Sequence, residues 1–185
     1  MSSGGSRHRG RELALQALYA VDLELRRPKR EAGPVHSLEL GAPVGELQET
    51  LVAAEAGTSA GSETPICISG SDARRVFEGI AAHFEAPPAV REFAWQLVSE
   101  VCARISCLDE RIAVRARNWR LSRMAAVDRN ILRLGTYELA HTSTPAPVVM
   151  NEAVELARRY GSDASAGFVN GILDALASDL RDETR

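Results

Sequence analysis

The sequence predicts an all-α protein, a compact bundle of about seven helices. Apolar residues recur with a period of about 3.6 over most of the chain, and no stretch alternates apolar and polar residues as a strand does. Aromatic residues make up 5% of the 185 residues, so the core must rely on Leu, Ala, Val and Ile, which favours helix-on-helix packing. Short connections between the later helices favour antiparallel neighbours.

The first helix is expected over residues 11–25. Its apolar side chains share one face: Ala14, Leu18, Val21 and Leu25. The period is then lost. From residue 28 to residue 71 glycine, proline, serine and threonine recur, and only residues 44–56 have the pattern of a short helix. Such composition is typical of a low-complexity insertion, so we expect a single domain, residues 1–185, that carries one.

Three more helices are expected between residues 72 and 115. Asp72 is the predicted N-cap of the first, which Pro87 and Pro88 end. The third starts near Leu108 and has acidic residues in its first turn, where the helix dipole favours negative charge. The apolar faces of the first two contain Val76, Ile80 and Phe84, and then Val90, Ala94, Leu97, Val101 and Ile105.

The last three helices follow in close succession. Ser122 is the predicted cap of the first, which the stretch 142–147 ends. Pro147 suits the first turn of the second, and Gly161 is expected just beyond it as a C′ glycine. Ser162 or Asp163 then caps the third. The apolar positions of the first and third are Val127, Ile131, Leu134 and Leu139, and Phe168, Ile172 and Leu176.

Composition restricts the function classes. A net charge of −3 excludes a wholly basic surface, so any contact with nucleic acid must come from a local patch. No apolar run approaches the roughly 20 residues of a membrane span, and the N-terminus lacks the apolar core of a secretory signal. Cys67, Cys102 and Cys107 lack metal-type pairing, and we interpret them as free thiols in a reducing cytoplasm.

No active site is predicted. The four histidines are scattered, and neither a nucleophile elbow nor a phosphate-binding glycine loop is present. Asn151, Glu152 and Glu155 have helical spacing that suits a cation, but a solvated helix face is the favoured interpretation. We therefore expect a binding protein with no catalytic residue, no cofactor and no metal ligand.

Two basic clusters are candidates for contact with nucleic acid. Arg7, His8, Arg9 and Arg11 lie at the entry to the first helix and can neutralise several phosphates or stack on bases. A solubilising tail is the alternative, and composition does not separate the two. The second cluster, residues 26–30, ends the same helix, where cations also interact favourably with the helix dipole.

Polar residues in three other places have an alternative structural role. Asn170 and Gly171 are poor helix formers in the middle of the last helix, which indicates either close packing of a neighbouring helix or contact with a ligand. Tyr19 lies just off the apolar stripe of the first helix and suits a partly exposed contact. Asp128 and Asn130 either bind a partner or stabilise the start of their helix.

Four segments together resemble the NusB family of transcription antitermination factors. They are RHRGRELALQALY (7–19), VDRNILRLGTYEL (127–139), VVMNEAVELARRYG (148–161) and FVNGILDAL (168–176). The resemblance covers both ends of the chain and its middle from about residue 90, but not residues 28–71. It implies two packed three-helix halves plus an extra helix. It also implies binding of boxA RNA in nascent ribosomal RNA transcripts, binding of the ribosomal protein NusE, and association with an RNA polymerase complex.

The resemblance also implies roles for individual residues. Arg7, Arg9 and Arg11 are expected to face RNA with Asn170 beside them. A NusE-like partner is expected at Tyr19 and Asp128.

The chain departs from the family pattern in three places. Gly167 stands where many members have a lysine, which removes one phosphate contact. Gly10 replaces an alanine often seen inside the arginine cluster and is expected to loosen the start of the first helix. The insertion at residues 28–71 is longer than the usual connection.

Two other functions remain open at this point. NusB-like domains also occur in ribosomal RNA cytosine methyltransferases, but those have a following cofactor domain with a glycine-rich turn, which this sequence lacks. A structural helical protein that forms a homodimer is the third possibility. Salt-dependent RNA binding would distinguish the first function from the third.

Overall fold

The computed structural model describes residues 3–26, 69–116 and 119–183. Most of the expected insertion at 28–71, the expected short helix at 44–56 and all of the second basic cluster beyond Arg26 lie outside these residues.

Seven α-helices and no strand are present in the described residues, which confirms the predicted all-α class. A 3₁₀ turn, Leu121–Arg123, precedes the fifth helix. The helices are α1 (Ser3–Arg26), α2 (Gly70–Ala82), α3 (Pro88–Ala103), α4 (Ile105–Arg115), α5 (Ala126–His141), α6 (Ala146–Tyr160) and α7 (Ser165–Glu183).

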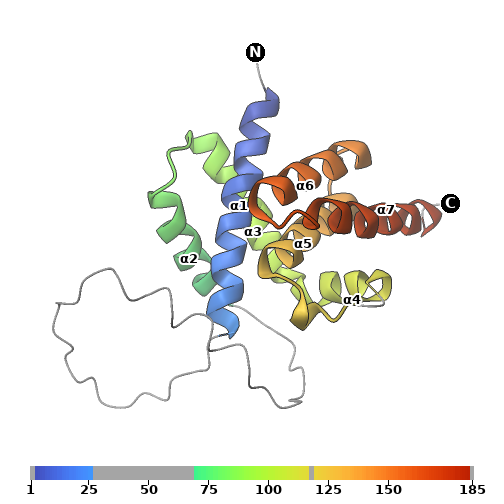
Figure 1. The fold of residues 1–185 in the computed structure, drawn as a ribbon. Coiled ribbons are helices and arrows are strands. Elements are labelled where there is room, and N and C mark those ends of the chain that lie inside the picture. The colour runs from blue at the N-terminus through green and yellow to red at the C-terminus, as the bar shows by residue number, and fades with distance from the viewer. Residues whose placement is uncertain (1–2, 27–68, 117–118, 184–185) are drawn as a thin grey trace, which may run out of the picture. The chain divides into compact units, whose positions relative to one another are not determined.

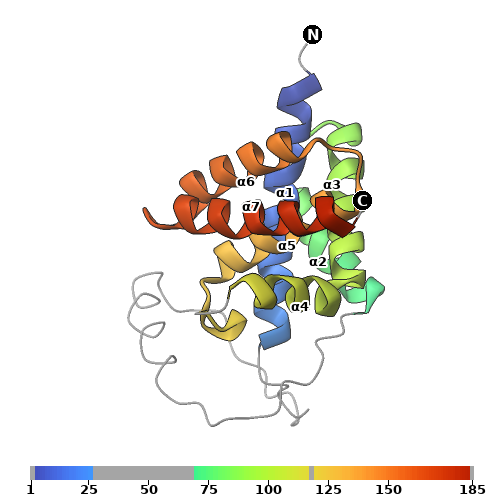
Figure 2. The same cartoon turned by 90° about the vertical axis from the view of Figure 1, so that its right-hand side faces the viewer.

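The helices form two groups of three with α4 added to the second group. Helices α1, α2 and α3 contact one another, as do α5, α6 and α7. Helix α1 also contacts α5, and α4 packs on α5 and α7. Figure 1 shows α1 between α2 on one side and α5, α6 and α7 on the other, and Figure 2 shows α6 and α7 lying alongside each other across α1.

The core matches the predicted apolar stripes. Leu18, Val76, Leu97, Ile131 and Leu176 are each less than a tenth exposed and belong to one continuous cluster. None of the helices in the described part of the chain is long and apolar enough to cross a membrane.

Several predicted helix boundaries are wrong. Helix α1 begins at Ser3 rather than at residue 11, and α4 begins at Ile105 rather than near Leu108. The N-cap of α2 is Ser69, whose hydroxyl accepts a hydrogen bond from the Asp72 amide at 3.1 Å, so Asp72 lies inside the first turn. Ser122 belongs to the 3₁₀ turn and makes no cap for α5. The helix predicted to run through Ile105 breaks at Arg104, whose φ of −118° and ψ of 13° leave the helical region.

Gly161 also differs from its prediction. Its φ is −97°, so it does not adopt the left-handed conformation typical of a C′ glycine. Glycine is required there for space, because a Cβ atom would lie 2.5 Å from the Ser165 hydroxyl and 2.7 Å from the Ala157 carbonyl.

Helix α5 is buried on almost every side, including its charged residues. Arg133 is 1% exposed and binds Asp109 with two bonds of 2.7 Å and Asp22 with one of 2.9 Å. Arg129 also binds Asp22. This network joins α1, α4 and α5. Burial would raise the pKa of Asp22, but the bonds and charges of the two arginines outweigh it, so the pKa is lowered.

A carboxyl group with a lowered pKa in the folded state stabilises the fold at neutral pH and loses that effect in acid. The stabilisation by Asp22 is complete above its unfolded pKa of about 3.9 and is lost as the pH falls through the lower folded value. The stability gap between the wild type and Asp22→Asn should therefore be largest near neutral pH and shrink below about pH 4. Denaturant unfolding at a series of pH values measures it, with the exposed Asp163→Asn as control. A gap independent of pH would contradict this role.

The two described cysteines are free thiols. Burial raises the pKa of Cys102 to about 11, although the charge of Arg133 opposes this, so the thiol stays protonated at neutral pH. Cys107 is exposed, and Cys67 lies outside the described residues.

Candidate nucleic-acid interface

The start of α1 presents two exposed arginines that rest on aromatic rings. The guanidinium carbon of Arg7 lies 4.3 Å from the centroid of Phe93. That of Arg9 lies 5.8 Å from the centroid of Phe84, and its Nη2 donates a 2.5 Å hydrogen bond to the Glu85 carbonyl. Stacking positions a guanidinium while leaving donors at its edge. Both side chains are therefore partly ordered before an anion binds, so less conformational entropy is lost when it does.

Gly10 explains how Phe93 comes so close to α1. Gly10 is buried, and a Cβ atom there would lie only 2.5 Å from Cδ1 of Phe93. The glycine therefore makes room for the ring that Arg7 covers. The sequence suggested that Gly10 loosens the helix, whereas the structure shows a close packing contact between α1 and α3.

The expectation that Arg11 faces RNA must be corrected. Arg11 is 4% exposed, and its Nε and Nη2 donate hydrogen bonds of 2.8 and 2.7 Å to the two carboxylate oxygens of Glu138. Its Nη1 also lies 3.6 Å from Glu152. Burial would lower the pKa of Arg11, but the bonds and charge of Glu138, together with Glu152, raise it overall. The guanidinium is a charged structural group with no exposed face for a phosphate.

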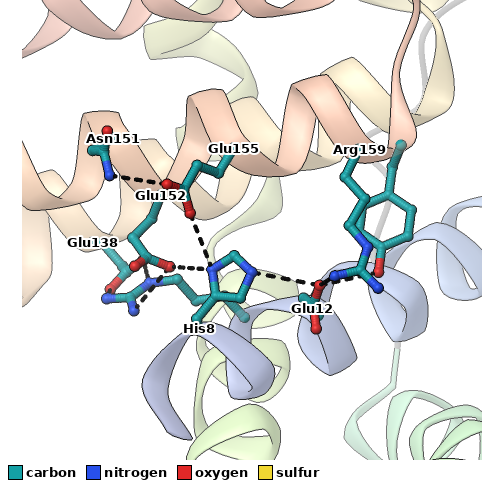
Figure 3. Close-up of polar contacts among 9 residues, drawn as sticks. His8, Glu12, Glu138, Asn151, Glu152, Glu155 and Arg159 are labelled. Carbon is teal, nitrogen blue, oxygen red and sulfur yellow. Dashed lines mark hydrogen bonds and ion pairs between the residues drawn. The ribbon is translucent and has the colours of Figure 1, made fainter. Parts of the chain in front are cut away.

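A polar cluster lies beside Arg11, between α1 and α6 (Figure 3). The Nδ1 atom of His8 lies 2.9 Å from Glu152 and 3.7 Å from Glu155. Its Nε2 atom lies 3.5 Å from Glu12, which accepts hydrogen bonds from Arg159 at 2.5 Å and from the Tyr160 hydroxyl at 3.3 Å. The cluster connects the start of α1 to two turns of α6.

Tyr19 and Asp128 occupy different environments. Tyr19 is 38% exposed on α1, as a contact residue requires. Asp128 is 9% exposed, and its Oδ1 has no hydrogen-bond partner among the described residues. It lines a cavity of about 220 Å³ together with Trp119 and Phe168, whose rings meet edge to face at 5.5 Å. A buried carboxylate oxygen without a partner suits a donor supplied from outside.

Asn130, the neighbour of Asp128 for which a partner contact was an alternative, has a structural role. Its side-chain amide donates a 2.8 Å bond to the Ala126 carbonyl, and its oxygen accepts a 3.1 Å bond from Arg133. Asn130 is 1% exposed, so it is part of the buried network.

Asn170 is exposed on α7 and borders a groove of about 480 Å³ between α6 and α7. Gly171 is also exposed, and a Cβ atom there would meet nothing within 4 Å. The interpretation that Gly171 admits a neighbouring helix is therefore wrong. Gly167 has the same open surroundings.

The family is decided by comparison with known proteins. The model described as NusB family matches residues 69–178. The transcription antitermination protein NusB of Citrifermentans bemidjiense is 35% identical over 179 residues, which cover 96% of this chain and 98% of that protein. The chain belongs to the NusB family. The NusB protein of Anaeromyxobacter dehalogenans is 50% identical over a shorter stretch, 49% of this chain and 64% of that protein.

Solved NusB structures have the same fold. T. maritima NusB superposes with a TM-score of 0.65 at 25% identity, over 94% of this chain and 91% of that one. A crystal structure of antitermination factors NusB and NusE in complex with dsRNA gives a TM-score of 0.63 at 21% identity, over 95% and 98% of the two chains. These relatives confirm the helical bundle, and the NusB family confirms transcription antitermination, rather than catalysis, as the function.

The candidate residues of this NusB protein lie in separate places. Arg7 and Arg9 pack against α3 and the end of α2, whereas Asn170 borders the α6–α7 groove. The described hydrogen bonds and ring contacts of Arg7 and Arg9 are with Phe93, Phe84 and Glu85, and do not include Asn170.

Sequence reasoning missed two neighbours of the candidate residues. Phe93 supports Arg7, and the 57% exposed Trp119 lines the cavity at Asp128. Aromatic residues are few in this chain, and this rarity was the available sign that Phe93 and Trp119 deserved notice.

Proposed function

We propose that this NusB protein binds boxA-type RNA of nascent ribosomal RNA transcripts together with a NusE-like ribosomal protein. The complex then joins RNA polymerase in the cytoplasm and opposes termination. Arg7 and Arg9 bind RNA, with Asn170 as a further contact, and Tyr19 and Asp128 bind the protein partner. Arg11 supports the arginines from inside the bundle.

The arrangement at the start of α1 carries the RNA proposal. Two exposed cations are held on aromatic rings beside a helix end, in a chain whose net charge is otherwise negative. Arginine in this setting binds phosphate with two parallel donors or stacks on a base. A fold relative was solved in complex with NusE and dsRNA, which agrees with both partners.

The partner proposal depends on an exposed ring and a buried acceptor. Tyr19 offers an aromatic surface, and aromatic side chains supply much of the binding energy at protein interfaces. Asp128 offers Oδ1 as an acceptor in the cavity that it lines together with Trp119. A partner with a basic or amide donor that enters this cavity satisfies the carboxylate.

Tyr19→Asp should weaken binding to the cognate NusE-like protein by well over tenfold, because it replaces an aromatic contact with a charge that must be desolvated. The melting temperature should change little, since the side chain is already partly exposed. Pull-down and calorimetry with that protein, with and without boxA RNA, measure the effect. Val114→Asp on α4, also an exposed apolar residue, is the control.

A loss of folding in Tyr19→Asp would place the ring in the core instead. Unchanged affinity would remove Tyr19 from the partner surface. If the wild type forms a stable homodimer that the partner cannot dissociate, the homodimer is the better assignment of this surface.

Gly167→Lys should restore the phosphate contact that this chain lacks. The position is exposed with open space for a side chain, so no packing must change. The slope of log affinity against log salt for single-stranded boxA RNA should steepen by about 0.7. Gly79→Lys is the control, because Gly79 is equally open but lies on α2. An equal gain in both variants would show only the effect of added charge.

A further inference from the structure

The cluster of His8, Glu152 and Glu155 has the geometry of a metal site. One ligand atom from each residue can be chosen so that all lie within 4.8 Å of one another. The imidazole Nδ1 is 2.9 Å from one carboxylate and 3.7 Å from the other. Ligand atoms bound tetrahedrally at about 2.0–2.2 Å from zinc are about 3.3–3.6 Å apart, so small side-chain movements suffice.

We propose that His8, Glu152 and Glu155 bind a divalent transition-metal ion of the zinc type. One imidazole nitrogen and two carboxylate oxygens suit such an ion, whereas magnesium and calcium prefer oxygen ligands alone. The two glutamates are three residues apart on α6 and project to the same side (Figure 3). The histidine comes from α1, so the ion fixes the start of that helix on α6.

A third carboxylate orients the imidazole. Glu12 lies 3.5 Å from Nε2 of His8, opposite the side that faces the two α6 glutamates. Metal-binding histidines commonly direct their second nitrogen to a carboxylate, which fixes the tautomer and the ring orientation. Glu12 is itself held by Arg159 and Tyr160, so this support is present without the ion.

The charge around the cluster favours a cation. Glu12, Glu138, Glu152 and Glu155 face two guanidinium groups, those of Arg11 and Arg159. Four negative and two positive charges leave a net charge of −2 when the imidazole is neutral.

Arg11 leaves Glu152 available for an ion. It makes both of its short bonds to Glu138 and lies farther, at 3.6 Å, from Glu152. The side chain of Glu155 is 49% exposed, which leaves a path for an ion and room for bound water.

Titration calorimetry of the full chain with Zn²⁺, and visible spectra with Co²⁺, test the site. The wild type should bind one equivalent at this cluster. His8→Asn and Glu155→Gln should each weaken Zn²⁺ binding at least tenfold and remove the Co²⁺ spectrum. His83→Asn and Glu110→Gln, which change exposed residues elsewhere, should bind as the wild type does. A Cys67→Ser/Cys107→Ser background removes two thiols that could compete and leaves the buried Cys102 in every sample.

Equal Zn²⁺ affinity in the wild type and both site variants would overturn the proposal. Equal affinities for Mg²⁺ and Zn²⁺ would also overturn it, because they would indicate only attraction of any divalent cation to the negative charge. If His8→Asn folds poorly, Glu155→Gln decides alone. The Glu155 side chain is half exposed, and its polar contacts with other described residues are one of 3.4 Å to Asn151 and the one to His8. The proposal does not depend on RNA or on a protein partner.

Discussion

Glu138→Leu is expected to lower the free energy of unfolding by about 3–5 kcal/mol, because it leaves the buried guanidinium of Arg11 without its main partner. Both residues are less than 5% exposed, so water cannot replace the lost acceptors. Glu152, at 3.6 Å, compensates only in part. Denaturant unfolding followed by circular dichroism measures the loss.

The double variant Arg11→Met/Glu138→Leu provides the control. Replacing a buried ion pair by apolar residues of similar size is often close to neutral, so most of the stability should return. This variant should also keep its affinity for RNA, since Arg7 and Arg9 remain. A Glu138→Leu variant of unchanged stability would contradict the structural role of Arg11. A double variant that folds but no longer binds RNA would show that Arg11 contacts RNA after all.

Arg7→Gln/Arg9→Gln is expected to weaken boxA RNA binding by more than about 100-fold. Each charged hydrogen bond contributes about 1.5–3 kcal/mol, and two such contacts would be lost. The slope of log affinity against log salt should fall by about 1.4, or about 0.7 for each phosphate contact on a single strand. A loss of preference for boxA over scrambled RNA would show that the arginines also contact bases.

Arg74→Gln/Arg75→Gln is the matched control for that experiment. It removes the same charge from exposed side chains, and Arg74 also rests on a ring, 4.6 Å from the centroid of Trp95. Stability should barely change in either double variant, because surface substitutions usually have effects below about 0.5 kcal/mol. If both double variants bind boxA RNA equally well, the arginines of α1 contribute only general positive charge to RNA binding.

The apolar period predicted the number and order of the helices, because packing in a bundle requires one buried stripe on each helix. It could not predict the break at Arg104. No glycine or proline marks that position, and the direction of α4 depends on its packing against α5 and α7. The cap of α2 moved from Asp72 to Ser69 because several polar residues near that start compete for the role. Helix α5 has no side-chain cap at all, since its N-cap residue is Ala125.

The burial of charged residues was harder to predict from the sequence than the helix boundaries. Arg7, Arg9 and Arg11 look alike in the sequence, yet the partner of Arg11 is 127 residues away on α5. One signal was available, because Arg11 lies three residues before Ala14 and extends the apolar stripe by a turn. His8 also lacked any indication of its neighbours, which are on α6.

Helix α1 carries both proposed contact surfaces and acts as a spacer of fixed length between them. Arg7 and Tyr19 are 12 residues apart, which corresponds to about 18 Å along an unbroken helix. At about 100° per residue, their side chains point in directions about 120° apart. If RNA binds at Arg7 and the protein partner at Tyr19, as proposed, the two ligands approach α1 from different sides. A one-residue insertion in α1 between these positions would alter their relative orientation by about 100°, and would therefore disturb any contact that the two ligands make with each other.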